Sequence, residues 1–231
     1  MSLSALAVVI PARDEEDLLP ACLASVAVAV AALSTAAPQV RSRVFVVLDS
    51  CRDDSATIVA RHRAVTAVPV HLGNVGAARA AGVEAAAAWA RSGDGAHLWI
   101  ACTDADSEVP SHWLVGQLEL ASEGHDLVVG TVQPRPADLT DSELREWRSR
   151  HCLDDGHHHV HGANLGFSLD AYRSVGGFPP LLVHEDVELV AAMRNAGIAH
   201  VATGRMPVTT SGRHTGRAPA GFAAFLDGLG A

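Results

Sequence analysis

A repeated order of short apolar runs and longer helical stretches is the feature of this sequence that most restricts its fold. β-Branched apolar runs occupy residues 6–10, 44–48, 68–72 and 98–102, and each ends in a polar turn. Alanine- and leucine-rich stretches lie between them, at about residues 15–33, 55–63 and 75–91. Strands that alternate with helices form right-handed βαβ units. The pattern therefore predicts an α/β domain with a single mixed, mostly parallel sheet flanked by helices.

The second half of the chain departs from this alternation. We expect helices at 111–121, 141–153 and 185–195, strands at 126–131 and 165–169, a Pro-rich bend at 133–138 and an apolar corner at 175–178. A histidine-rich loop covers 155–161, and the segment 209–217, rich in Gly and Arg, indicates another loop. No repeat or linker divides the chain, so we expect one domain over residues 1–231. In it, residues 1–107 form a nucleotide-binding half and residues 108–231 complete the pocket.

Composition excludes several classes of protein. Hydrophobic residues make up 48% of the 231 positions, which is enough for a core and excludes a disordered chain. The net charge of −9 excludes a general binder of nucleic-acid backbones. The four cysteines are widely spaced without a C-x-x-C pair, which favours a reducing, cytoplasmic location. The longest apolar run, residues 21–37, is alanine-rich and interrupted by Ser and Thr, so we expect neither a signal peptide nor a membrane span.

The sequence Asp104-Ala105-Asp106 directly follows the apolar run at 98–102. In open α/β sheets, ligands collect at the carboxyl ends of the strands. Two carboxylates at such an end offer the hard oxygen ligands that Mg²⁺ and Mn²⁺ prefer when they bridge the phosphates of a nucleotide. The alternative is a turn in which Asp106 caps the next helix. The position after a buried run favours a metal and phosphate site.

The ends of the second and third runs carry a second set of candidates. Asp49 lies directly at a strand end, where its carboxylate can accept a hydrogen bond from a base imide, which would favour uracil. Gly76 lets a backbone approach a ligand closely, and Arg79 offers a planar fork for phosphate. The neighbouring Asp53 reads as a simple helix cap.

The sequence His184-Glu185-Asp186 opens a predicted helix. Acidic residues in a first helical turn are favoured by the helix dipole, and this accounts for Glu185. Asp186 has a further possible role, because a carboxylate that points into the cleft can take the proton from an attacking hydroxyl.

Six segments in this order resemble family 2 glycosyltransferases of the GT-A fold. They are VVIPARDEEDLLPACLASV, VVLDSCRDDSA, GNVGAARAAGV, the DAD of TDADSEVPSHWL, HGANLGFSLDAYRSVGGF and HEDVELVAAMRNAG. The likeness extends from about Val8 to about Ala202. It implies transfer of a sugar from a nucleotide diphosphate donor to an acceptor hydroxyl. This chain departs from many members at Val75, where they carry Lys, so Arg79 or Arg52 would supply the phosphate charge.

The resemblance also implies roles for individual residues. The nucleotide-sugar would be bound by Pro11, Ala12, Arg13, Glu15, Asp49, Gly76, Arg79, Asp104, Ala105 and Asp106. The acceptor would be bordered by His161, Gly162, Ala163 and Asn164. Asp106 would touch the Mn²⁺ or Mg²⁺ ion, and Asp186, in the pair with Glu185, would be the general base of an inverting displacement.

Several alternatives remain open on the sequence. His214 resembles the C-terminal metal-binding histidine of glucosyl-3-phosphoglycerate synthases, which retain configuration. The histidines at 157–161 are a weaker candidate for a metal cluster, and the segment around Arg213 for a lid over the diphosphate. A nucleotidyltransferase and an inactive nucleotide-sugar binding module are the rival functions. The expected partners are a UDP-sugar and a small-molecule or glycan acceptor, with a homodimer possible.

Overall fold

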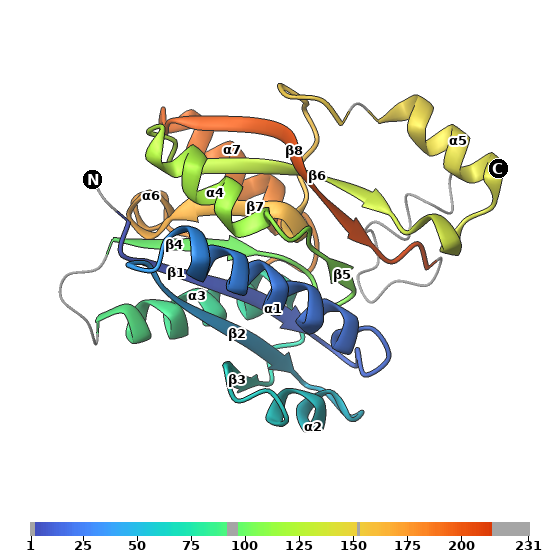
Figure 1. Cartoon of the computed structure of the whole chain (residues 1–231), viewed down its shortest axis with the longest axis horizontal. Coiled ribbons are helices and arrows are strands. Elements are labelled where there is room, and N and C mark those ends of the chain that lie inside the picture. The colour runs from blue at the N-terminus through green and yellow to red at the C-terminus, as the bar shows by residue number, and fades with distance from the viewer. Residues whose placement is uncertain (1–2, 92–96, 152, 214–231) are drawn as a thin grey trace.

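The computed structural model describes residues 3–91, 97–151 and 153–213, and in these ranges eight strands form one sheet. Their order is β3-β2-β1-β4-β7-β6-β8-β5 (Figure 1). The first block is parallel and consists of β1 (Ala5–Ala12), β2 (Arg41–Asp49), β3 (Val65–Val70) and β4 (Leu98–Cys102). The predicted runs thus form this block, although the third strand begins and ends earlier than expected. The α/β class and the mostly parallel, helix-flanked sheet are confirmed.

The second block makes the sheet mixed. The strand β7 (Leu165–Ser168) is antiparallel both to β4 and to β6 (Leu127–Pro134). Because β7 runs against β4, its first residue, Leu165, pairs with the last residue of β4, Cys102. The residues just before β7 therefore lie at the same edge of the sheet as the residues just after β4.

The strand β8 (His200–Thr210) was not predicted from the sequence. It lies parallel to β6 and pairs at its end with the short antiparallel strand β5 (Ser107–Glu108). Gly204 and Pro207 interrupt its sequence, and both disfavour a strand on propensity alone. The register between β6 and β8 shifts between Gly130 and Val132, so this irregular strand is held by its position in the sheet.

Helices cover both faces of the sheet. They are α1 (Leu19–Ala36), α2 (Ser55–Ala60), α3 (Val75–Arg91), α4 (Trp113–Ser122), α5 (Asp141–Arg150), α6 (Leu169–Ser174) and α7 (Glu185–Asn195), with 3-10 turns η1 (Pro136–Asp138) and η2 (Gly162–Asn164). The short α6 replaces the end of a predicted strand, and α5 ends three residues before its predicted end.

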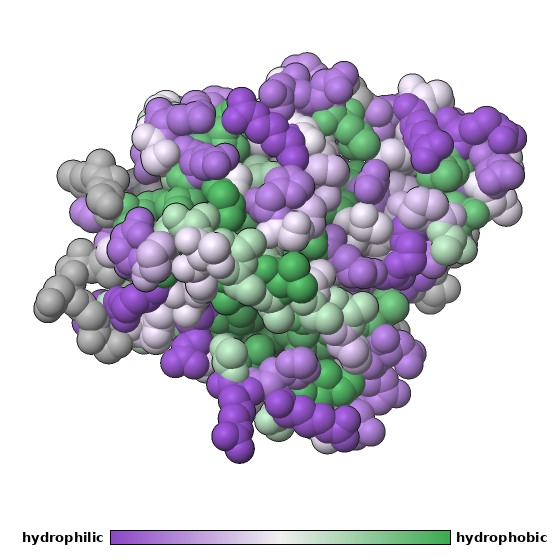
Figure 2. Space-filling model, viewed as in Figure 1, coloured by the Kyte–Doolittle hydropathy of each residue, from purple (hydrophilic) through white to green (hydrophobic). Residues whose placement is uncertain are grey.

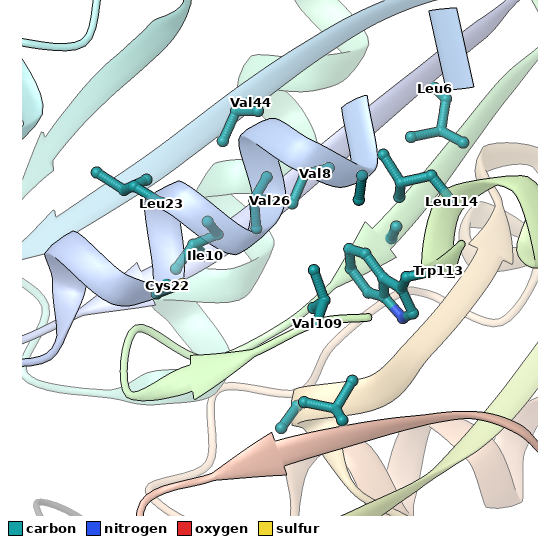
Figure 3. Close-up of a cluster of buried hydrophobic side chains, with 14 of the residues drawn as sticks. Leu6, Val8, Ile10, Cys22, Leu23, Val26, Val44, Val109, Trp113 and Leu114 are labelled. Atoms are coloured by element: carbon teal, nitrogen blue, oxygen red, sulfur yellow. The ribbon is translucent and has the colours of Figure 1, made fainter. Parts of the chain in front are cut away.

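The alternation of side chains along β1 produces two cores. Leu6, Val8 and Ile10 face α1 and α4 on one side, whereas Ala5, Ala7 and Val9 face α3 and the helices of the second half on the other. Figure 3 shows side chains of α1 facing those of β1 in the first core, with Trp113 of α4 beside them. The domain therefore has three layers, with the sheet in the middle.

The helix α1 is long and apolar enough to cross a membrane by length and composition alone. In the structure one side of α1 packs on the sheet through Leu19, Cys22, Leu23, Val26, Ala29 and Leu33, so it serves as a core helix of the domain. Its outer side carries mostly small apolar residues, and Figure 2 shows weakly hydrophobic atoms gathered along it, in contrast to the hydrophilic surface around α5.

Asn164 joins three elements of the second half. Its Nδ2 donates to the carbonyl oxygens of Thr131 (2.8 Å) and Met206 (2.7 Å), and its Oδ1 accepts from Trp113 Nε1 (2.9 Å). Gly130 makes room for this amide, because a Cβ there would collide with it. The side chain is 1% exposed. Asn164 therefore joins β6, β8 and α4 through its side chain, and its expected place beside the acceptor stays a prediction.

We predict that Asn164→Ala lowers the free energy of unfolding by about 3 kcal/mol, because it leaves a buried indole N–H and two buried carbonyl groups without this partner. Urea denaturation at pH 7 measures the loss. The control is Asn195→Ala at the exposed end of α7, which is expected to change the value by less than about 0.5 kcal/mol. A value for Asn164→Ala equal to that of the control would contradict the role given to the amide.

Candidate active site

A cleft of about 780 Å³ lies at the carboxyl ends of the parallel strands, beside the start of β7. Most of the predicted site residues line it: Pro11, Ala12, Arg13, Glu15, Asp49, Arg79, Asp104, Ala105, Asp106, His161, Gly162, Ala163, Glu185 and Asp186. Residues from both halves of the chain thus share one cavity. Three non-glycine residues of the described chain have positive φ, Asp14 (52°), Ser50 (59°) and His184 (64°), and each adjoins a lining residue. Unusual backbone geometry of this kind concentrates at functional sites.

Arg79 connects the acids of the two halves. Its Nη2 lies 2.5 Å from Asp104 Oδ1, and its Nε lies 2.9 Å from Glu185 Oε1. The arginine is 2% exposed, and burial opposes its charge, but the two carboxylates raise its pKa. Gly162 packs on the guanidinium so closely that a Cβ there would collide with it. The phosphate contact expected of Arg79 stays a prediction, and the structure gives the guanidinium two carboxylate partners instead.

The two acids at the start of α7 have different surroundings. Glu185 is 5% exposed and paired with Arg79, and burial raises its pKa in spite of that pair. Asp186 Oδ2 accepts from the backbone N–H of Gly162 (2.5 Å), and its Oδ1 accepts from Val187 N–H (2.8 Å). Asp186 is therefore oriented by the segment that precedes β7, whereas Glu185 anchors the helix start to Arg79.

Asp49 organises the loop between β3 and α3. Its carboxylate accepts from the backbone N–H groups of Leu72 (2.7 Å), Gly73 (2.9 Å) and Asn74 (3.1 Å). Burial alone would raise its pKa, but these donors lower it, so the carboxylate is charged at neutral pH. A carboxylate has about four acceptor positions, and Oδ2 accepts only one of these three N–H groups. Its contact with a base stays a prediction.

Asp106 lies at the floor of the cleft between two sets of partners. Its Oδ1 accepts from the hydroxyls of Ser107 and Thr210, both at 3.3 Å, and its Oδ2 lies 3.0 Å from Arg213 Nη2. Burial and the nearby Asp104 raise its pKa to about 6, while Arg213 opposes the rise. Oxygen donors that already attract a cation fit a hard divalent ion such as Mn²⁺ or Mg²⁺.

A second acidic group lies in the neighbouring loops. Ligand atoms of Asp14, Cys51 and Asp53 lie within 4.8 Å of one another. Each is already engaged, because Asp14 accepts from Arg52 N–H, Cys51 Sγ donates to the carbonyl of Ala12, and Asp53 accepts from Glu16 N–H. A thiol whose pKa is raised by burial is a poor ligand for Mg²⁺. This group holds two loops together beside the cleft.

The histidine-rich loop forms a stack of rings at the cleft wall. Trp147 stacks on His151 with centroids 4.6 Å apart, His151 on His159 at 4.8 Å, and His159 on His161 at 6.1 Å. Among the described residues, no three of these histidines bring ligand atoms close enough for one ion. The sequence indicated neither the stack nor the role of Trp147, because the rings meet only after α5 folds back on the loop.

Three predicted residues are not found at the cleft wall. Gly76 is not among the lining residues, and its N–H donates to the carbonyl of Leu181 (3.2 Å), so its contact with a ligand stays a prediction. Asn164 is buried, as described above. His214 lies outside the described residues. The sequence also did not indicate that the apolar residues Leu182, Val183 and Val187 line the cleft, because they belong to no recognisable motif.

The sequence profile described as "Glycosyl transferase family 2" matches residues 7–176. This is most of the chain, so the chain belongs to glycosyl transferase family 2. A search among curated protein sequences gives no significant match.

Solved structures with the same fold share the GT-A architecture with this chain. TarS 1-349 of S. aureus in complex with UDP is 15% identical, with 92% of this chain and 61% of that chain covered and a TM-score of 0.60. GalNAc-T7 with UDP, GalNAc and Mn²⁺ is 13% identical, with coverages of 93% and 46% and a TM-score of 0.65. The mannosyltransferase PcManGT from Pyrobaculum calidifontis with GDP-Man and Mn²⁺ is 19% identical, with coverages of 89% and 56% and a TM-score of 0.59. This chain thus spans between 46% and 61% of the length of these three proteins.

The ring stack predicts a pH dependence of stability. Burial and the neighbouring histidines lower the pKa of His161 from 6.5 to about 4, so between these values the unfolded chain binds more protons than the folded chain. The stabilising contribution of neutral His161 is present above pH 6.5 and is lost as the pH falls toward 4. Between pH 7 and pH 5 this amounts to about 2 kcal/mol.

We predict that His161→Gln loses that acid dependence, whereas His158→Gln, at an exposed position of the same loop, keeps it. Chemical denaturation of the three proteins at pH 5 and pH 7 makes the comparison. The interpretation is wrong if the wild type and His161→Gln lose equal stability on acidification.

Proposed function

We propose that this chain transfers a sugar from a nucleotide diphosphate donor to an acceptor hydroxyl. The observation that carries the proposal is that the acids at the end of β4 and the acids at the start of α7 line one cleft and are bridged by Arg79. A transfer reaction needs a site that holds the leaving group next to a site that holds the nucleophile, because proximity and orientation supply much of the rate.

The donor side of the cleft is built by the first half of the chain, residues 1–107. Pro11 and Ala12 end β1 and Arg13 follows it, and Asp49 is the last residue of β2; all four line the cleft. A UDP-sugar suits this wall, because the Asp49 carboxylate can accept a hydrogen bond from the imide N–H of uracil. The UDP in the TarS and GalNAc-T7 structures and the GDP-Man in the PcManGT structure support a nucleotide-sugar in this fold.

A divalent cation belongs to the proposed donor site. Asp106 would hold it, with Asp104 nearby, and the oxygen donors of both fit Mn²⁺ or Mg²⁺. Bound there, the ion would neutralise charge that develops on the leaving diphosphate. The Mn²⁺ in the GalNAc-T7 and PcManGT structures supports this assignment.

The acceptor side lies in residues 108–231, where Gly162, Ala163 and His161 line the cleft next to Asp186. Asp186 takes the proton of the acceptor hydroxyl, and Gly162 N–H orients the carboxylate. Glu185 is a positioning residue, because its carboxylate is committed to Arg79. A base at this position favours direct displacement with inversion. A retaining reaction that uses His214 as a metal ligand is the alternative.

Incubation of the full chain with Mn²⁺, a panel of nucleotide sugars and hydroxyl acceptors tests the proposal. Release of a nucleoside diphosphate together with a glycosylated product supports it. Release of pyrophosphate would indicate nucleotidyl transfer instead, and donor binding without turnover over a broad acceptor panel would indicate a binding module. The anomeric configuration of the product, read by NMR, separates inversion from retention.

We predict that Asp186→Asn lowers kcat by 10²- to 10⁴-fold, the usual contribution of a general base, and leaves the donor Kd nearly unchanged. Asp170→Asn is the control, since that carboxylate is 86% exposed on α6 and does not line the cleft. Near-normal turnover of Asp186→Asn would remove the base assignment.

We predict that Asp106→Asn weakens Mn²⁺-dependent binding of the donor by at least tenfold, because a neutral amide replaces the charged ligand of the ion. Calorimetry with UDP in the presence and absence of Mn²⁺ measures the effect. A Mn²⁺ dependence equal to that of Asp170→Asn would place the ion elsewhere.

A further inference from the structure

Arg213 lies between two acids of the cleft that are far from it in the sequence. Its Nη1 and Nη2 form a bidentate pair with Glu15, at 2.8 Å and 2.6 Å, and Nη2 also lies 3.0 Å from Asp106 Oδ2. The side chain of Glu15 is 7% exposed and that of Arg213 is 26% exposed. Bidentate pairs of arginine with a partly buried carboxylate are among the stronger polar contacts in proteins.

The backbone just before Arg213 is held by two hydrogen bonds. The N–H of Ser211 donates to the carbonyl of Asp106 (3.1 Å), and the N–H of Gly212 donates to Asp138 Oδ2 (2.8 Å). The first of these two contacts continues the antiparallel pairing of β5 with β8, so the fold brings Arg213 close to Asp106. The guanidinium therefore has a defined place in the cleft.

The two carboxylate oxygens of Asp106 have different partners. Oδ1 accepts from the hydroxyls of Ser107 and Thr210, whereas Oδ2 has Arg213 as its partner. A cation that binds Asp106 has Oδ2 as its natural ligand, which is the atom that the guanidinium already contacts. Two cations on one carboxylate oxygen repel each other, so the ion and Arg213 compete for Oδ2.

We propose that Arg213 is the built-in counter-ion of the cation site: it neutralises Asp106 in the donor-free chain, yields Oδ2 to the divalent ion, and then faces the diphosphate. The bidentate pair with Glu15 keeps the guanidinium beside the site after it leaves Oδ2. The part of this inference that concerns the diphosphate rests on the proposed function. The competition with the ion does not, because it concerns the chain without donor.

Mn²⁺ alone is the first probe, with free Mn²⁺ measured by electron paramagnetic resonance and no nucleotide present. We expect Arg213→Gln to bind Mn²⁺ about tenfold tighter than the wild type, the effect of removing a charged hydrogen-bond partner of the ligand oxygen. Arg205→Gln changes an arginine of β8 whose side chain is 57% exposed; it removes the same charge and is expected to match the wild type. Equal Mn²⁺ affinity in the Arg213 and Arg205 variants would overturn the inference.

Two further variants keep the test decisive. Arg213→Lys retains the charge but loses the fork, so we expect an intermediate affinity for Mn²⁺ even where the glutamine variant folds poorly. Adding Asp106→Asn to Arg213→Gln is expected to abolish the tighter binding. Tight binding that persists in this double variant would place the ion away from Asp106 and overturn the inference.

UDP with saturating Mn²⁺ is the second probe. We expect Arg213→Gln to bind UDP several-fold more weakly than Arg205→Gln, because it lacks the cation that faces the diphosphate. Equal UDP affinity of Arg213→Gln and Arg205→Gln would overturn the inference that Arg213 contacts the diphosphate. Sugar transfer is measured separately. If Arg213→Gln binds Mn²⁺ more tightly but the wild type transfers no sugar, the proposed function is contradicted and the competition between Arg213 and the ion is still supported.

Discussion

The buried Arg79 guanidinium holds together the two parts of the chain that make the cleft. An arginine side chain stays charged in proteins, so its burial requires acidic partners at close range, here Asp104 and Glu185. The pair of Arg79 with Glu185 is buried on both sides, and removing one partner of such a pair costs on the order of 3–5 kcal/mol. Separating the loop after β4 from the start of α7 would therefore cost free energy. Asp106 lies two residues after Asp104, and Asp186 is next to Glu185, so the contacts of Arg79 also fix the positions of these two acids in the cleft.

The first half of the fold could be predicted from the sequence because its information is local. Each buried strand of the parallel block is a short β-branched run, and each functional acid follows such a run or opens a helix. The strand β8 could not be predicted in this way, since Gly204 and Pro207 break its pattern. It is stabilised by its pairing with β6, which lies far away in the sequence. The sheet is mixed because β7 is antiparallel to β4 and β6, and β5 is antiparallel to β8.

In the site, too, the types of the residues could be predicted from the sequence, but their partners could not. The sequence indicated that Asp106, Asp186 and Arg79 are chemically suited to a cleft, and all three line it. It did not indicate that carboxylates surround Arg79, nor that the amide of Asn164 serves the core, because a residue's partners depend on how distant segments pack. The sequence shows which side chains are charged or polar, but only the folded structure shows which groups neutralise the charge of Arg79.

The pairing of Glu15 with Arg213 joins positions 198 residues apart, and β5 receives its partner from β8. During synthesis on the ribosome, the parallel block can assemble while the later segment is still emerging, because a growing chain folds from its N-terminal end. Glu15 and Asp106 then lack their partner Arg213 until residues 200–213 have left the exit tunnel. Contacts of such long range are slow to form, so the completion of this cleft is expected among the last events of folding.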